Sequence, residues 1–207
     1  MGEIIARIGK FFMDIIEVVV ISMSIFIVIY LFLMQPHQVK GSSMFPTFKD
    51  GEYLMTDKVT YKRRPPQRGE IIVFKAPIAE SFDFIKRVMG VPGDRLMVKD
   101  GKLWLNGQPL DEPYLPPEYV TRGGQYMREG QEIVVQPETI MAIGDNRGHS
   151  SDSREWGPVP FANLIGKALF RYWPPNAFWV VDHISVGPSQ TSSAVRESLA
   201  VILNPKP

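Results

Sequence analysis

The sequence predicts a mainly β domain that follows a single N-terminal membrane-spanning helix. Residues 18–34 form one uninterrupted apolar run, and the chain after it consists of short β-rich runs separated by glycine and proline. No segment with a helical period of comparable strength competes with these runs. With 207 residues and 44% hydrophobic content, the chain is long enough for one compact domain and an anchor. We expect an N-terminal segment at 1–14, a transmembrane anchor at 15–35, a β-rich domain at 36–182 and a C-terminal tail at 183–207.

The apolar run at 18–34 carries no charged side chain, which puts it at the low end of the length that spans a bilayer. A cleaved signal peptide is the alternative interpretation. The run is long for the apolar region of a signal peptide, however, and no small-x-small cleavage site follows it, so we expect an uncleaved anchor. Arg7 and Lys10 precede the run, while Lys40 and Lys49 follow it. Because these charges nearly balance, the positive-inside rule leaves the orientation open.

The strand candidates after the anchor are apolar runs bounded by turn residues. Asp100-Gly101 is a two-residue hairpin signal, and Asn106-Gly107 supplies a second turn directly afterwards. Residues 108–131, rich in proline, glycine and tyrosine, predict a long surface excursion, and 194–203 could form a short amphipathic helix. Many short strands favour a sandwich-like or barrel-like domain. The candidates are residues 52–59, 70–76, 83–91, 94–98, 102–105, 132–136, 139–145 and 164–173.

Composition excludes several classes of function. The 23 basic and 22 acidic side chains give a net charge of +1, so nothing suggests a nucleic-acid partner. The absence of cysteine excludes disulfides, thiolate metal sites and cysteine nucleophiles. The histidines, which we expect on the surface, lack the spacing of a zinc protease; they are His37, His149 and His183. A basic cluster is interpreted as a solvated loop, with lipid headgroups or a partner as the alternative contact; it comprises Lys62, Arg63, Arg64 and Arg68.

Two ways of activating a serine remain open on the residues alone. A Ser-His-Asp triad is assembled by folding, so spacing does not exclude one that uses His149. A lysine can serve as the base only if burial lowers its pKa from about 10.4 by two to three units, which corresponds to about 3 to 4 kcal/mol. Such a lysine should therefore stand on an apolar face of a strand.

Lys86 meets that requirement if residues 82–88 are extended. It then shares one face of the strand with Phe82, Phe84 and Val88. Arg87 lies on the opposite face, where Asp83, four residues earlier, is an acidic neighbour. The alternative is that Lys86 belongs to an edge strand and keeps its amine in water.

Three segments behind the anchor read GSSMFPT at 41–47, FIKRVMGVPGD at 84–94 and GDNRGHSSDSREWGPV at 144–159. Together and in this order they resemble the motif boxes of type I signal peptidases, the membrane-anchored Ser-Lys proteases that remove signal peptides. The resemblance covers roughly residues 14–173. It implies a β-rich catalytic domain of signal-peptidase type on the outer face of the membrane and no cofactor. It also implies signal-peptide-bearing precursors and membrane lipid as partners.

Matched position by position, the resemblance assigns Ser43 as the nucleophile and Lys86 as the general base. Ser150 matches the serine that helps to orient the lysine amine. Gly41 departs from members that place a serine two residues before the nucleophile, so we expect backbone N–H groups to hold the oxyanion. Structural support through ion pairs and loop hydrogen bonds is expected from Asp145, Arg147, Asp152 and Arg154.

The short distance along the chain from the anchor to Ser43 predicts where the substrate is met. The segment from Met34 to Ser43 spans at most about 30 Å when fully extended, so the nucleophile is confined near the bilayer surface. A precursor whose apolar region lies in the membrane presents its cleavage site there. The apolar neighbours Met44, Phe45 and Phe48 are expected either to contact lipid or substrate or to pack beneath the turn.

Two further alternatives accompany this interpretation. A soluble self-cleaving regulator with Ser-Lys chemistry is disfavoured by the anchor, and no DNA-binding module precedes the β domain. A membrane-anchored scaffold without activity would leave Ser43 and Lys86 unrelated in space. The pair Gly148-His149, where the resembled family commonly has Asp-Asn, leaves the geometry of that loop open.

Overall fold

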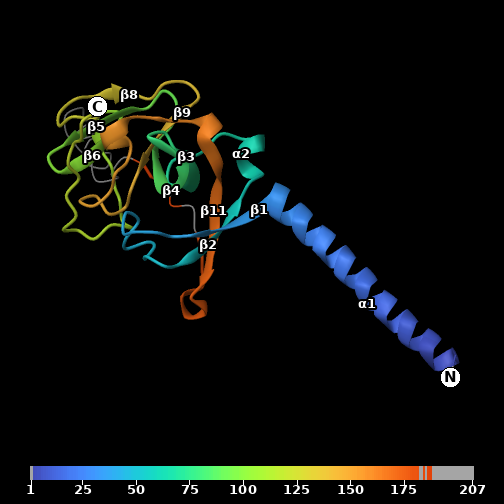
Figure 1. Ribbon diagram of the computed structural model, residues 1–207. Helices are drawn as coiled ribbons and strands as arrows, with labels where there is room; N and C mark the ends of the chain where they lie inside the picture. Colours follow the sequence, from blue (N-terminus) through green and yellow to red (C-terminus); the bar gives the residue numbers. More distant parts are fainter. Residues whose placement is uncertain (1, 182–183, 185, 188–207) are drawn as a thin grey trace, which may run out of the picture.

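The computed structural model describes residues 2–181, 184 and 186–187, and Figure 1 shows their arrangement. The N-terminal helix α1 (Gly2–Val28) continues through a π-helical turn, η1 (Ile29–Leu33), and projects away from the domain (Figure 1). The continuous helix Gly2–Leu33 has an 18-residue window of mean hydropathy 2.7, no part of which is buried. By length and composition it can cross a membrane once. The predicted tail helix at 194–203 and His183 lie outside the described residues.

An eight-stranded antiparallel sheet forms the larger part of the domain. Its order is β1-β2-β11-β3-β4-β9-β10, and β12 pairs with β11. β1 follows directly from the helix, with Met34 opposite Asp57 of β2. The strands are β1 (Met34–Gln38), β2 (Tyr53–Asp57), β3 (Ile71–Ala76), β4 (Ala79–Gly90), β9 (Thr139–Ile143), β10 (Val159–Pro160), β11 (Leu164–Trp173) and β12 (Trp179–Val180).

A second sheet of four strands, in the order β7-β6-β5-β8, covers one end of the domain. Asp100 (φ 53°) and Gly101 (φ 73°) form the predicted hairpin between β5 and β6, because both adopt the left-handed conformation that such a turn needs. The strands are β5 (Arg95–Lys99), β6 (Lys102–Leu105), β7 (Gln108–Pro109) and β8 (Ile133–Val134).

The mainly β fold class is confirmed, and every strand candidate contains a strand. The strands β1, β7, β10 and β12 were not predicted, because they are short or lack apolar alternation. β1, with the sequence MQPHQ, becomes a strand because the edge of β2 is available beside it. The remaining elements are single turns: α2 (Thr60–Arg63), α3 (Ser153–Trp156), η2 (Phe161–Asn163) and η3 (Pro175–Ala177).

The predicted surface excursion at 108–131 is only partly on the surface. Thr121 and Met127 within it are buried, and Met127 packs in the hydrophobic cluster beneath the small sheet. Arg154 binds the carbonyl oxygen of Arg122 through its guanidinium, which ties the excursion to α3. Long-range contacts therefore bury a segment whose composition resembles a loop.

A separate core cluster lies beneath the turn that carries Ser43. Met44 and Phe48 are fully buried in it, alongside Leu54 and Val73. Phe45, in contrast, is 41% exposed. Packing beneath the turn is therefore confirmed for Met44 and Phe48, whereas contact of Phe45 with lipid or substrate stays a prediction.

The expectation that His37 lies on the surface was wrong, and the expectation that the basic cluster is solvated holds for Lys62 and Arg63 but not for the other two arginines. His37 is half-buried, because β1 lies beside β2; its Nδ1 is 3.0 Å from the Thr56 hydroxyl and its Nε2 is 3.5 Å from Asp83. The basic cluster is not a uniformly solvated loop. Arg64 forms an ion pair with Glu70, and Arg68 forms one with Asp94.

Candidate active site

Ser43 lies in the loop that connects β1 to β2. The base of this loop is closed by two hydrogen bonds, from Val39 N–H to the Glu52 carbonyl at 2.8 Å and from Gly51 N–H to the Val39 carbonyl at 2.9 Å. Gly41 has φ of 84°, a conformation that favours glycine, and its N–H donates to Asp50 at 2.6 Å. Met44 and Phe48 of this loop are fully buried, whereas Ser43 is half-buried.

Lys86 enters the same place from β4. This strand lies between β3 and β9, so the alternative of an edge-strand lysine is wrong. The Lys86 side chain is 3% exposed, and its Nζ lies 2.8 Å from Ser43 Oγ and 3.0 Å from the Ile85 carbonyl oxygen. The Phe84 ring centroid is 5.0 Å from Nζ, which agrees with the predicted apolar face. Folding therefore brings the two predicted dyad residues within hydrogen-bond distance.

The electrostatic environment of Lys86 favours a neutral amine. Burial lowers the pKa of Lys86 from 10.5 to about 8, and the negative charges of Asp152 and Asp145 act in the opposite direction. Desolvation dominates because the amine loses its water shell, whereas the two carboxylates are already engaged by arginines. A pKa near 8 leaves a useful fraction of free base close to neutral pH.

A buried ion pair links β4 to the end of β9. Arg87 and Asp145 are both fully buried and joined by two hydrogen bonds of 2.9 and 2.7 Å. Thr47 of the nucleophile loop donates to Asp145 at 2.5 Å, and the Arg87 guanidinium lies 4.0 Å from the Tyr114 ring. The acidic partner of Arg87 is thus Asp145 and not Asp83, because the loop after β9 folds over the strand. Sequence reasoning missed Thr47, although it ends the first quoted segment, and Tyr114 had no signal in the sequence.

The loop after β9 also holds the backbone of the nucleophile turn. The backbone N–H of Asn146 donates to the Ser43 carbonyl at 3.0 Å, and its side-chain amide donates to the Ser42 carbonyl at 3.1 Å. Gly144 packs so closely against Ser43 and Ser150 that an added Cβ would lie 2.6 Å from the Ser43 oxygen. Sequence reasoning missed Asn146, although it stands within the third quoted segment.

Two further buried arginines stabilise this loop. Arg154 binds Asp152 through two hydrogen bonds of 2.8 Å, and burial, which would raise the pKa of Asp152, is outweighed by this partner. Arg147 binds Glu112 in the predicted excursion, at 2.9 Å through Nη1. The sequence offered no signal for Glu112, which lies far from Arg147 along the chain. These contacts place Asp152, Arg154 and Arg147 around the site without contact to Ser43.

Ser150 lies beside the site with its hydroxyl buried, and this oxygen has no hydrogen-bond partner among the described residues. The hydrogen bonds of Lys86 go to Ser43 and Ile85, so an orienting role for Ser150 stays a prediction. His149 is exposed and lies 3.4 Å from the Asn146 side chain. No hydrogen bond between described residues joins a histidine to Ser43, and no metal-binding cluster occurs among those residues.

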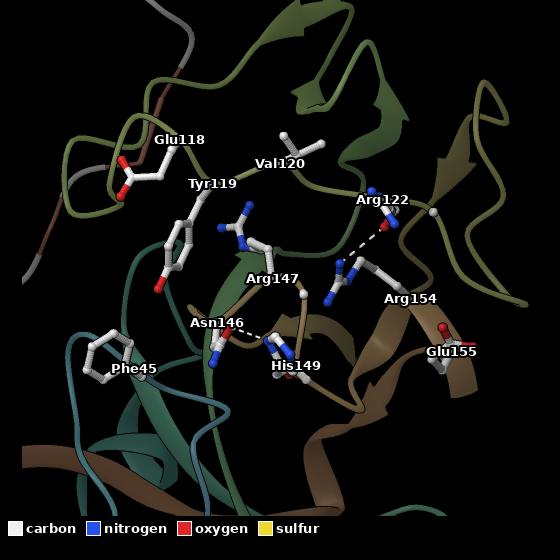
Figure 2. A pocket seen from close by; sticks show the side chains of 13 residues that line it. Phe45, Glu118, Tyr119, Val120, Arg122, Asn146, Arg147, His149, Arg154 and Glu155 are labelled. Carbon is white, nitrogen blue, oxygen red and sulfur yellow. Dashed lines mark hydrogen bonds between the residues drawn. The ribbon is translucent and has the colours of Figure 1, made fainter.

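Hollows lie on two sides of the nucleophile. The smaller, of about 200 Å³, is lined by Ser43, Lys86 and Val39, next to the strand that comes from the helix. The larger, of about 850 Å³, lies beyond the loop after β9. Figure 2 shows Phe45 and Tyr119 on one side of this view and Arg154 and Glu155 on the other, with Asn146 and His149 between them.

The fold and the site define a β-domain enzyme with a serine beside a buried lysine, and comparison with known proteins agrees. The family described as "Signal peptidase, peptidase S26" matches residues 12–173. The chain belongs to this family and is a serine endopeptidase of the signal peptidase I type.

The relatives extend over most of the chain. "Probable signal peptidase I-1" of Synechocystis sp. (strain ATCC 27184 / PCC 6803 / Kazusa) is 33% identical and covers 88% of this chain and 93% of its own length. "Signal peptidase I" of Leptolyngbya laminosa is 36% identical and covers 79% of this chain and 81% of its own length. "Signal peptidase IB" of Staphylococcus aureus (strain COL) is 33% identical and covers 80% of this chain and 93% of its own length. A signal peptidase I crystal structure from Enterococcus faecalis V583 aligns with 50% of this chain and 97% of that chain, with TM-score 0.43 and 27% identity.

Proposed function

We propose that this chain is a membrane-anchored endopeptidase that removes N-terminal signal peptides from exported precursors with Ser43 and Lys86. The observation that supports it most is the 2.8 Å separation between Ser43 Oγ and the Nζ of a lysine that is 3% exposed. An inactive scaffold would have no reason to bury a lysine against a serine hydroxyl, because desolvating the amine costs free energy. Membership in the signal peptidase family gives the substrate class.

In the acylation step, neutral Lys86 takes the proton of Ser43 while Oγ attacks the carbonyl carbon of the scissile peptide bond. The tetrahedral intermediate collapses as the C–N bond breaks, and the Lys86 ammonium returns its proton to the leaving amine. That amine is the new N-terminus of the mature protein. The signal peptide stays bound to Ser43 as an ester.

In the deacylation step, a water molecule replaces the departed amine. Lys86, neutral again, takes a proton from this water as its oxygen attacks the ester carbonyl. Collapse of the second tetrahedral intermediate returns the proton to Ser43 and releases the signal peptide with a free carboxylate. Each proton taken by the lysine is returned, so the cycle needs no other group.

The oxyanion of both intermediates is held by backbone donors in this proposal. Position 41 is glycine and supplies no hydroxyl. The backbone N–H of Gly41 is already engaged by Asp50. Among the hydrogen bonds between described residues, the Ser43 N–H has no acceptor, so it is available to the developing negative charge. The side-chain amide of Asn146 donates to the Ser42 carbonyl, which belongs to the same peptide group as the Ser43 N–H, and so keeps that group oriented.

The helix Gly2–Leu33 serves as the membrane anchor, with the domain on the outer face. β1 leaves this helix directly, and the smaller hollow is lined by Gln38, the last residue of that strand, and by Val39 and Lys40, which follow it. The signal-peptide side of a precursor therefore approaches Ser43 along the same route from the bilayer.

The experiment incubates a purified precursor with the full-length enzyme and maps the cleavage site by mass spectrometry. Ser43→Ala and Lys86→Met are expected to abolish cleavage, because each removes one partner of the proton transfer. Ser42→Ala is the matched control and should cleave at the same bond at close to the wild-type rate. Cleavage by Ser43→Ala at the wild-type rate would show that another nucleophile is used.

A further inference from the structure

A third hollow, of about 540 Å³, lies at the corner of the domain nearest to the helix. We call it the basic hollow, because Lys58, Lys62 and Lys75 line it together with Gln35, Tyr61 and Asp83. It is formed where α2 meets the ends of β3 and β11. Figure 1 shows α2 beside the junction of α1 and β1. None of its lysines takes part in the proposed mechanism.

The structure fixes this hollow at the end of the membrane helix. The Lys58 backbone N–H donates to the Leu33 carbonyl at 2.9 Å, and its Nζ donates to the Leu31 carbonyl at 2.9 Å. Leu31 and Leu33 belong to the last turn of the apolar helix. An ammonium group attached to that turn lies where hydrocarbon gives way to lipid headgroups. The basic hollow therefore faces the membrane interface.

The charge of the basic hollow is not neutralised by neighbouring acids. Among the described residues, no ion pair involves any of its three lysines. Its one acidic side chain, Asp83, contacts His37 at 3.5 Å. Glu70, a nearby carboxylate, is already engaged by Arg64 and by Lys167 at 3.0 Å. Three lysines against one aspartate leave the lining net positive.

The remaining surface of the hollow is apolar, with Phe161, Leu164 and Ile165 on one wall and the Tyr61 ring on another. A phospholipid fits such a mixture, because its phosphate meets the ammonium groups while the first methylenes of its acyl chains meet the apolar side chains. A small soluble anion would contact only the ammonium groups and not the apolar side chains of this hollow. We propose that the basic hollow binds the headgroup of an acidic phospholipid, such as phosphatidylglycerol, from the outer leaflet.

This inference rests on the proposed membrane anchoring and adds a lipid to the surroundings of the catalytic site. Asp83 lines both the basic hollow and the smaller hollow that holds Ser43 and Lys86. A headgroup bound beside Asp83 would hold this part of β4 at a fixed position relative to the bilayer. The precursor would then enter the other side at a constant height above the membrane.

The test uses the full-length protein in nanodiscs of equal parts phosphatidylglycerol and phosphatidylcholine, with retained lipids counted by native mass spectrometry. The variant Lys58→Gln/Lys62→Gln/Lys75→Gln should lose enrichment of phosphatidylglycerol, by about fivefold for each lysine removed. The matched control has the same charge change on the distant small-sheet side and should keep the wild-type enrichment; it is Lys99→Gln/Lys102→Gln/Arg128→Gln.

Three results would overturn the inference. The first is a triple variant with wild-type enrichment, and the second is a control variant with an equal loss. The third is loss of enrichment in the wild type on adding inorganic phosphate, which would indicate a site for free anions. Cleavage of a soluble peptide in detergent is measured in parallel, and all these variants should retain it. Failure of the proposed function would instead appear as cleavage by Ser43→Ala, whatever the lipid result.

Discussion

The pH dependence of peptide cleavage follows directly from the buried position of Lys86. With a pKa of about 8, the neutral fraction of Lys86 is about 1% at pH 6, about 10% at pH 7 and about 90% at pH 9. A lysine in water, with a pKa of about 10.4, would be neutral to only about 0.04% at pH 7. Burial thus provides an increase of about 250-fold in free base at neutral pH, and kcat/KM should follow this fraction.

The assay measures kcat/KM of the full-length enzyme between pH 6 and pH 9 in detergent, with a quenched fluorescent peptide that does not titrate in this range. The rate constant should rise about tenfold per pH unit below pH 7 and level off above pH 8, about 90-fold higher overall. Ser42→Ala is the control and should give the same curve. A flat profile, or a midpoint near 6.5 as expected for histidine, would refute the assignment of Lys86 as the base.

The remaining predictions concern stability, measured as the free energy of unfolding in urea. The pKa of Lys86 is about 8 in the folded protein and about 10.4 in the unfolded chain, so the free energy of unfolding should increase with pH between pH 8 and pH 10.4. For the same reason Lys86→Met, which removes the buried charge, should stabilise the protein at pH 7 by up to about 3 kcal/mol. Asp145→Asn should cost about 3 to 5 kcal/mol, because it leaves the Arg87 charge buried without its partner; a smaller loss for this variant than for an exposed aspartate would contradict that reasoning. Met44→Ala should cost about 2 to 5 kcal/mol, whereas Phe45→Ala, at an exposed position, should change stability little; equal losses would show that the turn packs differently.

Local patterns in the sequence were sufficient for much of the fold. The strand at 83–91, the hairpin at Asp100-Gly101 and the apolar N-terminal helix each depend on residues close together in the chain. Side-chain alternation and turn conformation are short-range properties, so they can be recognised without knowing which strands pair with one another. β1 could not be found in this way, because its pairing with β2 is what makes MQPHQ a strand.

The candidate site likewise contains residues that local motifs predicted and residues that only long-range contacts brought into place. Ser43 and Lys86 were found because three motif segments in order resemble one family, and their juxtaposition was implied by that resemblance. Glu112, which binds Arg147, had no local signal, since an ion pair between distant segments depends on the path of the chain.

The sequence by itself determined the apolar N-terminal helix, the β class of the domain and the candidate residues for the chemistry, because these follow from composition, periodicity and motif order. Tertiary structure decided that Lys86 is an interior-strand lysine with a lowered pKa, since burial arises only when β3, β9 and the nucleophile loop surround it. It also placed Lys58, Lys62 and Lys75 around one hollow beside the helix. Their separate positions in the chain carry no sign of that common surface.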